Sequence, residues 1–291
     1  KGQLVDMTMA EFARHYRKIK TYKEPEVALW TDILYGSDKQ YFWYLDPYMR
    51  TCVDLNQGGA LIDLRPYVAK LYLPVGIDTD RVYDASYPYL IQANYRAGYF
   101  THYAGEGTLK STKVTYNGEE VDLALCRSKG RHIDEGKRRI LRLDPIQVEF
   151  KNLTIEIATD IIFHQGSGEI IYKRKITKSS NPDALVEFND YVTATYGTTE
   201  YAEDMKSIVL GLGKEQKINY YYKNREEEIS SQEAYAIIPP VDTHLSIRSD
   251  GEYIAYFKEG YAFSPMLTLG IKKNLKLDEE ICTWLKLAKV A

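Results

Sequence analysis

The 291-residue sequence has few cysteines and no long apolar run. Its three cysteines, Cys52, Cys126 and Cys282, are far apart and form no CxxC pair, which argues against a disulfide framework or a zinc knuckle. No apolar run approaches the roughly 18 residues of a membrane span, so we expect no membrane-spanning segment. Because the start has no signal-type stretch and the cysteines are unpaired, we expect a reducing compartment, the cytoplasm.

An excess of positive charge is also absent. The 38 lysines and arginines are balanced by 41 aspartates and glutamates, which gives a net charge of −3. A protein that holds a nucleic-acid backbone needs a strong positive field. The charge balance therefore excludes nucleic acid as an expected partner.

Motifs for metal, nucleotide and nucleophile chemistry are missing as well. The five histidines never lie four residues apart, as the two ligands of a helical metal site would. The sequence contains no GxSxG serine elbow and no phosphate-binding P-loop. We therefore expect no metal site, no cofactor and none of the standard hydrolase or nucleotide chemistries.

Tyrosine is abundant, with 26 residues against 8 phenylalanines and 3 tryptophans. Tyrosine suits half-buried sheet faces, and it also suits surfaces that contact a ligand through a ring and a hydroxyl. The plainer of the two interpretations is a β-rich protein that packs its sheets with tyrosine.

Residues 1–39 are interpreted as a helical lead-in. Thr8 and Glu11 have the spacing of a capping box, and Met9 and Phe12 begin a set of apolar residues at helical intervals. Pro25 interrupts this pattern, and a second short apolar pattern follows it. We expect this segment to precede the main domain.

From Gln40 onward, the period of the apolar residues changes to two. The segment 155–163 alternates between apolar and polar residues, turns at a Gly-Ser-Gly sequence and returns over 169–176. Asn117-Gly118 marks another hairpin. Because strands recur at short intervals without helical patterns between them, we predict a mainly β fold, an antiparallel sandwich over residues 40–291.

The predicted strand 184–195 has two different faces. Asp190 lies on the face of Val186, Phe188 and Val192, where an unpaired carboxylate would be costly, so it must be paired, protonated or placed in a pocket. The other face carries Asn189 and Tyr191 among further polar residues. An amide, a carboxylate, hydroxyls and a ring are what a sugar needs from its site, although an ordinary solvated sheet face is the simpler alternative.

A second candidate stretch runs over residues 94–107. It places Arg96, His102 and Glu106 among aromatic rings and three glycines. Glycine permits close backbone approach to a ligand, and arginine can fork onto a carboxylate or onto vicinal hydroxyls. We interpret this stretch as the border of a sugar pocket, and the alternative is a glycine-rich connection with a structural histidine.

Several motifs follow one another in an order that is typical of a known fold. Residues 53–64 contain an N-x-G-G turn, and an arginine-containing segment, residues 94–96, follows about forty residues later. After it come two hairpins, at 116–119 and 163–170, and the closing segment 275–284. This order resembles the galactose mutarotase-like β-supersandwich, the fold of aldose epimerases and of sandwich domains in several glycoside hydrolases and polysaccharide lyases. The resemblance implies an antiparallel β-supersandwich behind a short helical lead-in.

The resemblance also implies site residues, with departures from the family. Where the family has its acid histidine, this chain has Asp190, which would take the acid role. Glu259 matches the family's base glutamate, Arg96 matches one of its two arginines, and His132 stands near its first histidine. Since the acid histidine is replaced, the resemblance implies an atypical activity and not ordinary aldose mutarotation.

Two functions follow from these observations. The first is a carbohydrate-processing protein, an atypical epimerase or glycan-active enzyme, that holds a sugar or oligosaccharide on its concave sheet. Glu259 and Asp190 would be its catalytic carboxylates, and Arg96, His102, Glu106, His132, Asn189 and Tyr191 would bind the substrate. The alternative is a non-catalytic sugar-binding or assembly sandwich of a larger enzyme, working with a catalytic partner domain or as a homo-oligomer.

Overall fold

The computed structural model consists almost entirely of antiparallel strands. It describes residues 7–19, 24–34, 36–67, 90–92, 112–194, 208–214, 216–219, 226–230, 232–239, 242–250, 253–261 and 265–290. Within these ranges there is one α-helix, α1 (Met9–Ile19), and there are two short 3-10 helices, η1 (Leu55–Gln57) and η2 (Leu123–Leu125). No helix in this part of the chain is long and apolar enough to cross a membrane. The predicted fold class, mainly β with antiparallel sheets, is confirmed.

The described strands form sheets of five, ten and six strands, and all neighbours pair antiparallel. The five-stranded sheet has the order β1 (Glu26–Thr31), β2 (Gln40–Leu45), β3 (Met49–Asp54), β4 (Ala60–Pro66), β5 (Ile91–Gln92). The six-stranded sheet has the order β16 (Glu226–Ser230), β19 (Ile254–Tyr261), β20 (Pro265–Leu275), β13 (Val186–Ala194), β6 (Thr112–Tyr116), β7 (Glu119–Asp122).

The ten-stranded sheet is the largest of the three. Its order is β15 (Gln216–Asn219), β14 (Val209–Leu212), β17 (Glu233–Ile238), β18 (Thr243–Ser249), β21 (Glu280–Lys289), β12 (Glu169–Ser179), β11 (Leu153–His164), β9 (Arg138–Leu143), β8 (Gly130–Glu135), and β10 (Ile146–Phe150) pairs with β11. The predicted hairpin of residues 155–163 with 169–176 is its β11–β12 pair.

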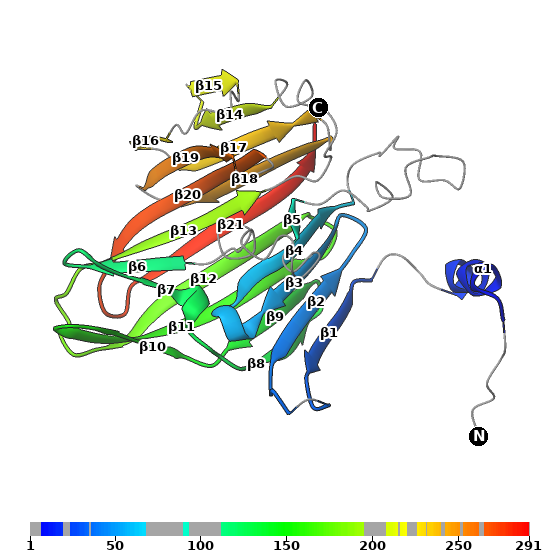
Figure 1. Ribbon diagram of the computed structural model, residues 1–291, viewed down its shortest axis with the longest axis horizontal. Helices are drawn as coiled ribbons and strands as arrows, with labels where there is room; N and C mark the ends of the chain where they lie inside the picture. The colour runs from blue at the N-terminus through cyan, green and yellow to red at the C-terminus, as the bar shows by residue number, and fades with distance from the viewer. Residues whose placement is uncertain are drawn as a thin grey trace.

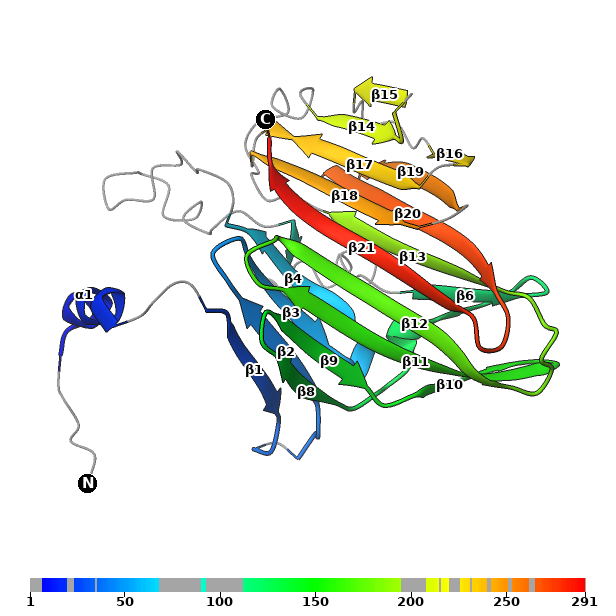
Figure 2. The same cartoon turned by 180° about the vertical axis from the view of Figure 1, so that it is seen from behind.

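The sheets pack as two layers. The ten-stranded sheet forms one layer, and the five- and six-stranded sheets cover the same face of it, as the two opposite views show (Figures 1 and 2). Two rings of β2, Phe42 and Tyr44, lie 5.4 and 4.7 Å from the ring of Phe163 in β11. In the six-stranded sheet, β20 contacts β17 and β18 of the opposite layer. The hydrophobic core therefore lies between the layers and includes residues of all three sheets.

Strand β11 shows why the sequence folds this way. Every second residue from Leu153 to Phe163 is buried, while the residues between them are partly exposed or exposed. A strand turns alternate side chains to opposite faces, so this alternation places one face of β11 in the core. Burying each large apolar side chain contributes about 1.5–3 kcal/mol. The period of two is thus the direct cause of the layered packing.

The N-terminal segment is only partly helical. The capping box that precedes α1 is confirmed, because Thr8 N–H donates to Glu11 Oε2 at 2.8 Å. The prediction of a helical lead-in over residues 1–39 is wrong for residues 26–31, which form the edge strand β1. Pairing with β2 satisfies the backbone of β1, and Val27 and Leu29 pack partly buried against the core. Two apolar residues two positions apart fit an edge strand as well as a short helix.

The N-x-G-G turn, residues 56–59, packs against the backbone of the 3-10 helix η2. Asp54 caps η1 by accepting a hydrogen bond from Asn56 N–H at 2.8 Å. Gly58 follows with φ +62°, a conformation that favours glycine, and a Cβ there would stand 2.0 Å from the carbonyl oxygen of Leu123. Backbone therefore approaches backbone so closely that only glycine fits at position 58.

This packing gives a testable difference between two glycines of similar φ. We expect Gly58→Ala to lower the free energy of unfolding by more than about 3 kcal/mol, because backbone strain adds to a clash with backbone. Gly118→Ala is the control, since Gly118 has φ +82° and a Cβ added there would meet no atom within 4 Å. This control substitution should lower the free energy of unfolding by only about 1–2 kcal/mol. Equal losses in urea denaturation would contradict the argument from the close approach.

Candidate functional site

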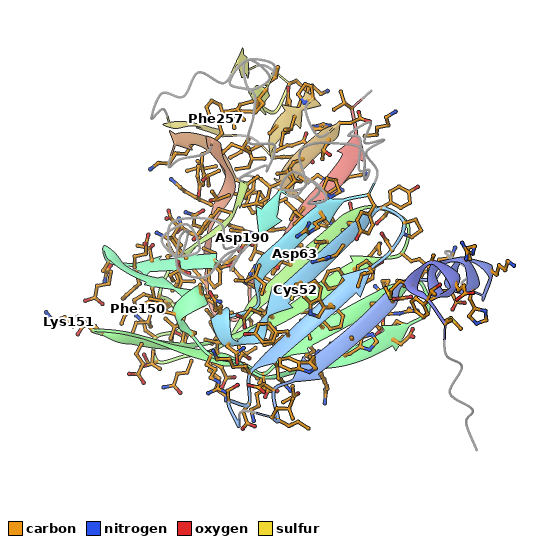
Figure 3. The ribbon with its side chains drawn as sticks, turned by 45° about the vertical axis from the view of Figure 1, so that its right-hand side comes forward. Cys52, Asp63, Phe150, Lys151, Asp190 and Phe257 are labelled. Atoms are coloured by element: carbon orange, nitrogen blue, oxygen red, sulfur yellow. The ribbon has the colours of Figure 1, made fainter. Side chains whose placement is uncertain are left out.

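Asp190, the predicted acid, lies on the inner face of β13 between the two layers (Figure 3). Its side chain is only 5% exposed, and three donors from three strands bind it. Arg174 Nη1 donates to Oδ1 at 2.8 Å, Thr283 Oγ1 donates to Oδ2 at 2.5 Å, and Thr112 Oγ1 donates to Oδ1. The prediction that Asp190 has a charged or hydrogen-bonded partner is confirmed.

Arg174 extends this contact to the third sheet. Its side chain is 3% exposed, and its guanidinium carbon lies 4.6 Å from the centre of the Tyr172 ring. The Tyr172 hydroxyl donates to the carbonyl oxygen of Gly59, beside β4, at 3.1 Å, and burial raises the pKa of Tyr172. The Arg174–Asp190 pair therefore lies where all three sheets meet.

The space beside this pair is small. A cavity of about 20 Å³ is lined by Arg174 and Asp190, by Leu61 of the five-stranded sheet and by other core residues. Such a volume holds about one water molecule and no sugar. The donors already occupy both carboxylate oxygens of Asp190. The geometry therefore supports a structural ion pair better than a catalytic acid at this position.

The opposite face of β13 carries polar groups and rings. Tyr256 donates from its hydroxyl to Asn189 Oδ1 at 2.9 Å, and the Tyr191 hydroxyl lies 3.5 Å from Asp122 Oδ2. The register places Tyr191 and Tyr256 on either side of Gly270 in β20. We call this set, Asn189, Tyr191, Tyr256, Gly270 and Asp122, the tyrosine face.

Gly270 makes the arrangement of the tyrosine face possible. A Cβ at this position would lie 2.2 Å from atoms of the Tyr256 ring, so the ring lies directly over the glycine backbone. Lys272 Nζ is 4.9 Å from the centre of the same ring. Burial and then the Asp122 carboxylate raise the pKa of Tyr191, which keeps its hydroxyl a hydrogen-bond donor. Tyr256 is only 5% exposed, whereas Tyr191 is partly exposed. The face thus combines one accessible ring with a hydroxyl, an amide, a carboxylate and an ammonium group.

Four of the other predicted residues are not described, either wholly or in their side chains. Arg96, His102 and Glu106 lie outside the described residues. Glu259 lies within β19, opposite Leu267, and its side chain is outside what the structure describes.

His132 lies on a different sheet from the tyrosine face. It lies in the edge strand β8, three strand spacings or roughly 14 Å from β12, the strand of Arg174. Its ring is 5.7 Å from that of Phe42, and its Nε2 atom is buried without a partner among the described residues. Burial, the largest cause, lowers the pKa of His132. These surroundings fit a neutral, packed histidine.

Three members of the tyrosine face were not predicted from the sequence. Asp122, Tyr256 and Gly270 come from strands that lie 65 residues or more from Asn189 in the chain. Their only local signal is membership of predicted strands, because the register between strands is a tertiary property. Among the described residues, no three histidine, cysteine, aspartate or glutamate side chains are arranged to hold a metal ion.

Comparison with known proteins identifies the fold. No protein-family model and no curated protein matches the chain. A galactose mutarotase-like protein from Clostridium acetobutylicum aligns with a TM-score of 0.59 and 7% identity over 90% of this chain and 98% of its own. A Klebsiella pneumoniae protein provisionally assigned as an aldose 1-epimerase gives 0.57 and 10% identity over 94% and 87%.

A longer enzyme also contains a region with this fold. The 4-alpha-glucanotransferase of Thermococcus litoralis aligns with a TM-score of 0.53 and 9% identity over 91% of this chain, which spans 40% of that enzyme. The chain therefore has the galactose mutarotase-like fold, as the order of its motifs predicted. At these identities, the likeness shows the fold alone.

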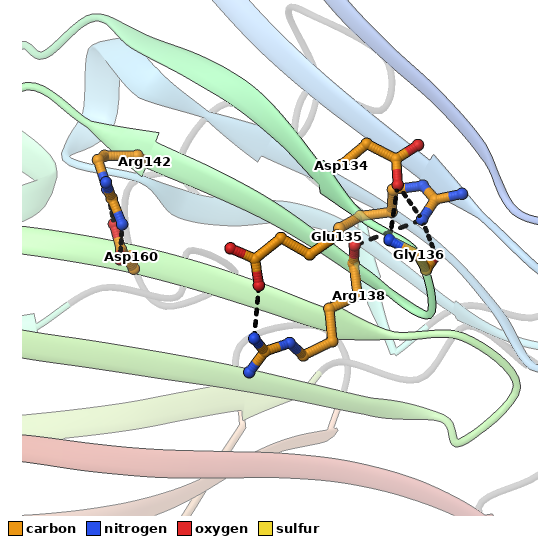
Figure 4. Close-up of polar contacts among 7 residues, drawn as sticks. Asp134, Glu135, Gly136, Arg138, Arg142 and Asp160 are labelled. Carbon is orange, nitrogen blue, oxygen red and sulfur yellow. Dashed lines mark hydrogen bonds and ion pairs between the residues drawn. The ribbon is translucent and has the colours of Figure 1, made fainter.

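The structural role of the buried ion pair can be measured by urea denaturation. We expect Asp190→Ala to lower the free energy of unfolding by about 3–5 kcal/mol, because it leaves the Arg174 charge buried without its partner. The control is Asp160→Ala, which removes the partner of Arg142 near the β8–β9 hairpin (Figure 4). This pair has two bonds of 2.8 Å, but its arginine is 46% exposed, so the loss should be about 1 kcal/mol or less. A small loss for Asp190→Ala would contradict the structural assignment.

The lowered pKa of His132 predicts a specific dependence of stability on pH. Because the folded state holds the neutral form, the unfolded state takes up the proton first, near the ordinary pKa of about 6.5. Stability should therefore decrease as the pH falls from about 7 to about 5, and the decrease should be smaller in His132→Phe. His244, whose pKa is lowered by the same cause, contributes similarly, so His132→Phe together with His244→Phe should flatten the profile further. An unchanged profile would show that His132 is not held neutral.

Proposed function

We propose that this chain binds a sugar on the tyrosine face and that it serves in carbohydrate binding or processing. The observation that carries the proposal is the partly exposed ring of Tyr191, whose hydroxyl is hydrogen-bonded to Asp122. Beside it, Tyr256 is packed over Gly270 with only 5% of its surface exposed and holds Asn189 through its hydroxyl. The fold supports it, since proteins with this fold include one named galactose mutarotase-like and one named a glucanotransferase.

The chemistry of the tyrosine face matches that of a sugar. The apolar C–H face of a pyranose packs on an aromatic ring, and its hydroxyls both donate and accept hydrogen bonds. The carboxylate of Asp122 accepts such bonds, the ammonium of Lys272 donates them, and the amide of Asn189 can do both. Since Tyr256 already fixes Asn189, the amide is held in place before a sugar arrives.

A processing role would need a proton donor and acceptor. From the family resemblance, we still propose Glu259 as the base. Arg96, His102 and Glu106 would orient the substrate. On the tyrosine face itself, Asp122 is the carboxylate that contacts the Tyr191 hydroxyl. We propose Asp122 as the acid–base candidate among the described residues in place of Asp190, with the Tyr191 hydroxyl as its hydrogen-bond donor.

A non-catalytic role has its own support. The chain spans 40% of the Thermococcus litoralis glucanotransferase, so the same sandwich also occurs beside other parts of a longer enzyme. A sandwich that holds a glycan beside a catalytic domain is therefore the second candidate function. The tyrosine face would then bind sugar without turning it over.

Binding can be tested by titrating monosaccharides and disaccharides into the protein in a calorimeter. We expect Tyr191→Ala to weaken binding about tenfold or more, because it removes a partly exposed ring worth roughly 1–2 kcal/mol. Tyr256→Phe should weaken binding by about fivefold, because it keeps the buried ring but removes the hydrogen bond that holds Asn189. Tyr235→Ala is the matched control: the Tyr235 ring also lies over a glycine, Gly211, but in the ten-stranded sheet. It should leave sugar binding unchanged.

The outcomes separate the alternatives. If the intact protein binds none of the sugars, or if Tyr235→Ala weakens binding as much as Tyr191→Ala does, the proposed site is wrong. Polarimetry of fresh sugar solutions then distinguishes an epimerase, which accelerates the change in optical rotation, from a binding sandwich, which does not. Loss of acceleration in Asp122→Asn with binding retained would support the acid–base assignment.

A further inference from the structure

The helix α1 carries an exposed apolar face outside the hydrophobic core. Met9 and Phe12, which lie three positions apart and so are neighbours on the helix surface, are 81% and 48% exposed. In the sequence, Tyr16 and Ile19 continue the same spacing of three and four residues. No described residue of α1 belongs to the core, and two opposite views show the helix apart from both layers (Figures 1 and 2). Packing in the sandwich therefore does not explain this apolar face.

The polar face of the same helix is basic. Arg14 and Lys18 lie four positions apart, and the side chains of both are exposed. Positions 9–20 hold four lysines and arginines against one glutamate, which gives this segment a charge of +3. Since the whole chain has a charge of −3, all the other residues together carry −6. The helix is thus opposite in sign to the rest of the protein.

The residues at its start fix where α1 begins, but they do not cover its apolar face. Thr8 N–H donates to Glu11 Oε2 at 2.8 Å, and Glu11 N–H donates to Thr8 Oγ1 at 3.3 Å. A helix of eleven residues is marginal in water on its own, and most of the stability of such helices comes from packing of the apolar face. A surface that covers Met9 and Phe12 would therefore stabilise the helix.

We propose that α1 binds the surface of a bilayer that contains anionic lipids. Helices that lie on membranes combine a polar face rich in lysine and arginine with an opposite face of aromatic and aliphatic residues, and their overall hydrophobicity is low. Met9 and Phe12 enter the boundary between headgroups and acyl chains, while Arg14 and Lys18 attract the anionic headgroups. The proposal does not depend on sugar binding, because none of these residues belongs to the tyrosine face.

The length and the charge of α1 determine how it meets the bilayer. The helix is about 16 Å long, roughly half the thickness of the hydrocarbon core, so it lies in the plane of the membrane and does not cross it. An uncharged bilayer would use only the apolar face. An anionic bilayer uses both faces at once, because it attracts the basic side chains and offers an apolar layer to the others.

Flotation with vesicles of phosphatidylcholine, with and without phosphatidylserine, tests the role of charge. We expect the protein to float with the mixed vesicles and to dissociate from them as sodium chloride is raised, because salt screens the attraction. Arg14→Glu combined with Lys18→Glu should weaken binding about tenfold or more. The matched control is Lys129→Glu combined with Lys178→Glu, which changes the net charge equally at two lysines of the sandwich that are 56% and 75% exposed. It should bind like the unchanged protein.

The apolar face is tested in the same assay. Met9→Glu should weaken binding about tenfold or more, because it places a charge where the helix enters the bilayer. An acidic residue in the first turn favours the helix, so melting of α1 would not explain the loss. Leu125→Glu is the matched control, since Leu125 is 86% exposed but lies in η2, and it should leave binding unchanged. Thermal unfolding of each variant shows that the sandwich is intact.

Four outcomes would overturn the proposal. The protein could fail to float with the mixed vesicles, or it could float equally well with phosphatidylcholine alone. A control variant could lose as much binding as the matching variant of α1. Finally, a dimer in the absence of lipid that dissociates in Met9→Glu would show that a second copy covers the apolar face. The binding of small sugars by Met9→Glu is a separate measurement, so failure of the membrane proposal would leave the proposed function untouched.

Discussion

The buried pair of Arg174 and Asp190 is the constraint on which the arrangement of both layers depends. Removing two charges from water costs several kcal/mol per ion, and a pair recovers this only with good geometry and further hydrogen bonds. Here Thr112 and Thr283 supply those bonds from two more strands. Because alternate residues of a strand face opposite ways, fixing Asp190 inward fixes Asn189 and its polar neighbours outward. The ion pair between the layers thus decides which side chains of β13 belong to the tyrosine face.

The local sequence pattern predicts much of the fold, and the pairing of residues distant in the chain accounts for the remaining features. The period of two in β11, the Asn117-Gly118 hairpin and the need of Asp190 for a partner all follow from neighbouring residues. That the partner is Arg174 does not, since β12 and β13 belong to different sheets. The helical prediction for segment 26–31 is wrong for a related reason: its strand is defined by pairing with β2, and none of its six residues is fully buried. The tyrosine face likewise depends on register, which no single stretch encodes.

Two of the 26 tyrosines have a packing role that the pairing of their strands explains. Tyr256 lies over Gly270 in the six-stranded sheet, and Tyr235 lies over Gly211 in the ten-stranded sheet. A glycine in a strand interior weakens the strand because it has no side chain to pack, and an aromatic ring from the next strand covers the gap. Phenylalanine would cover the backbone equally well, so the hydroxyl matters where it finds a partner, as that of Tyr256 does in Asn189. The Tyr256 hydroxyl thus connects the packing over Gly270 with the polar side chains of β13.

The contact between Tyr172 and Gly59 extends the same constraint to the five-stranded sheet. Tyr172 and Arg174 lie two residues apart in β12, so both side chains point to the same face of that strand. Arg174 binds Asp190 of the six-stranded sheet, and the Tyr172 hydroxyl donates to the carbonyl oxygen of Gly59 beside β4. One strand of the ten-stranded sheet therefore holds both covering sheets, and a change that displaces β12 would disturb the two of them together.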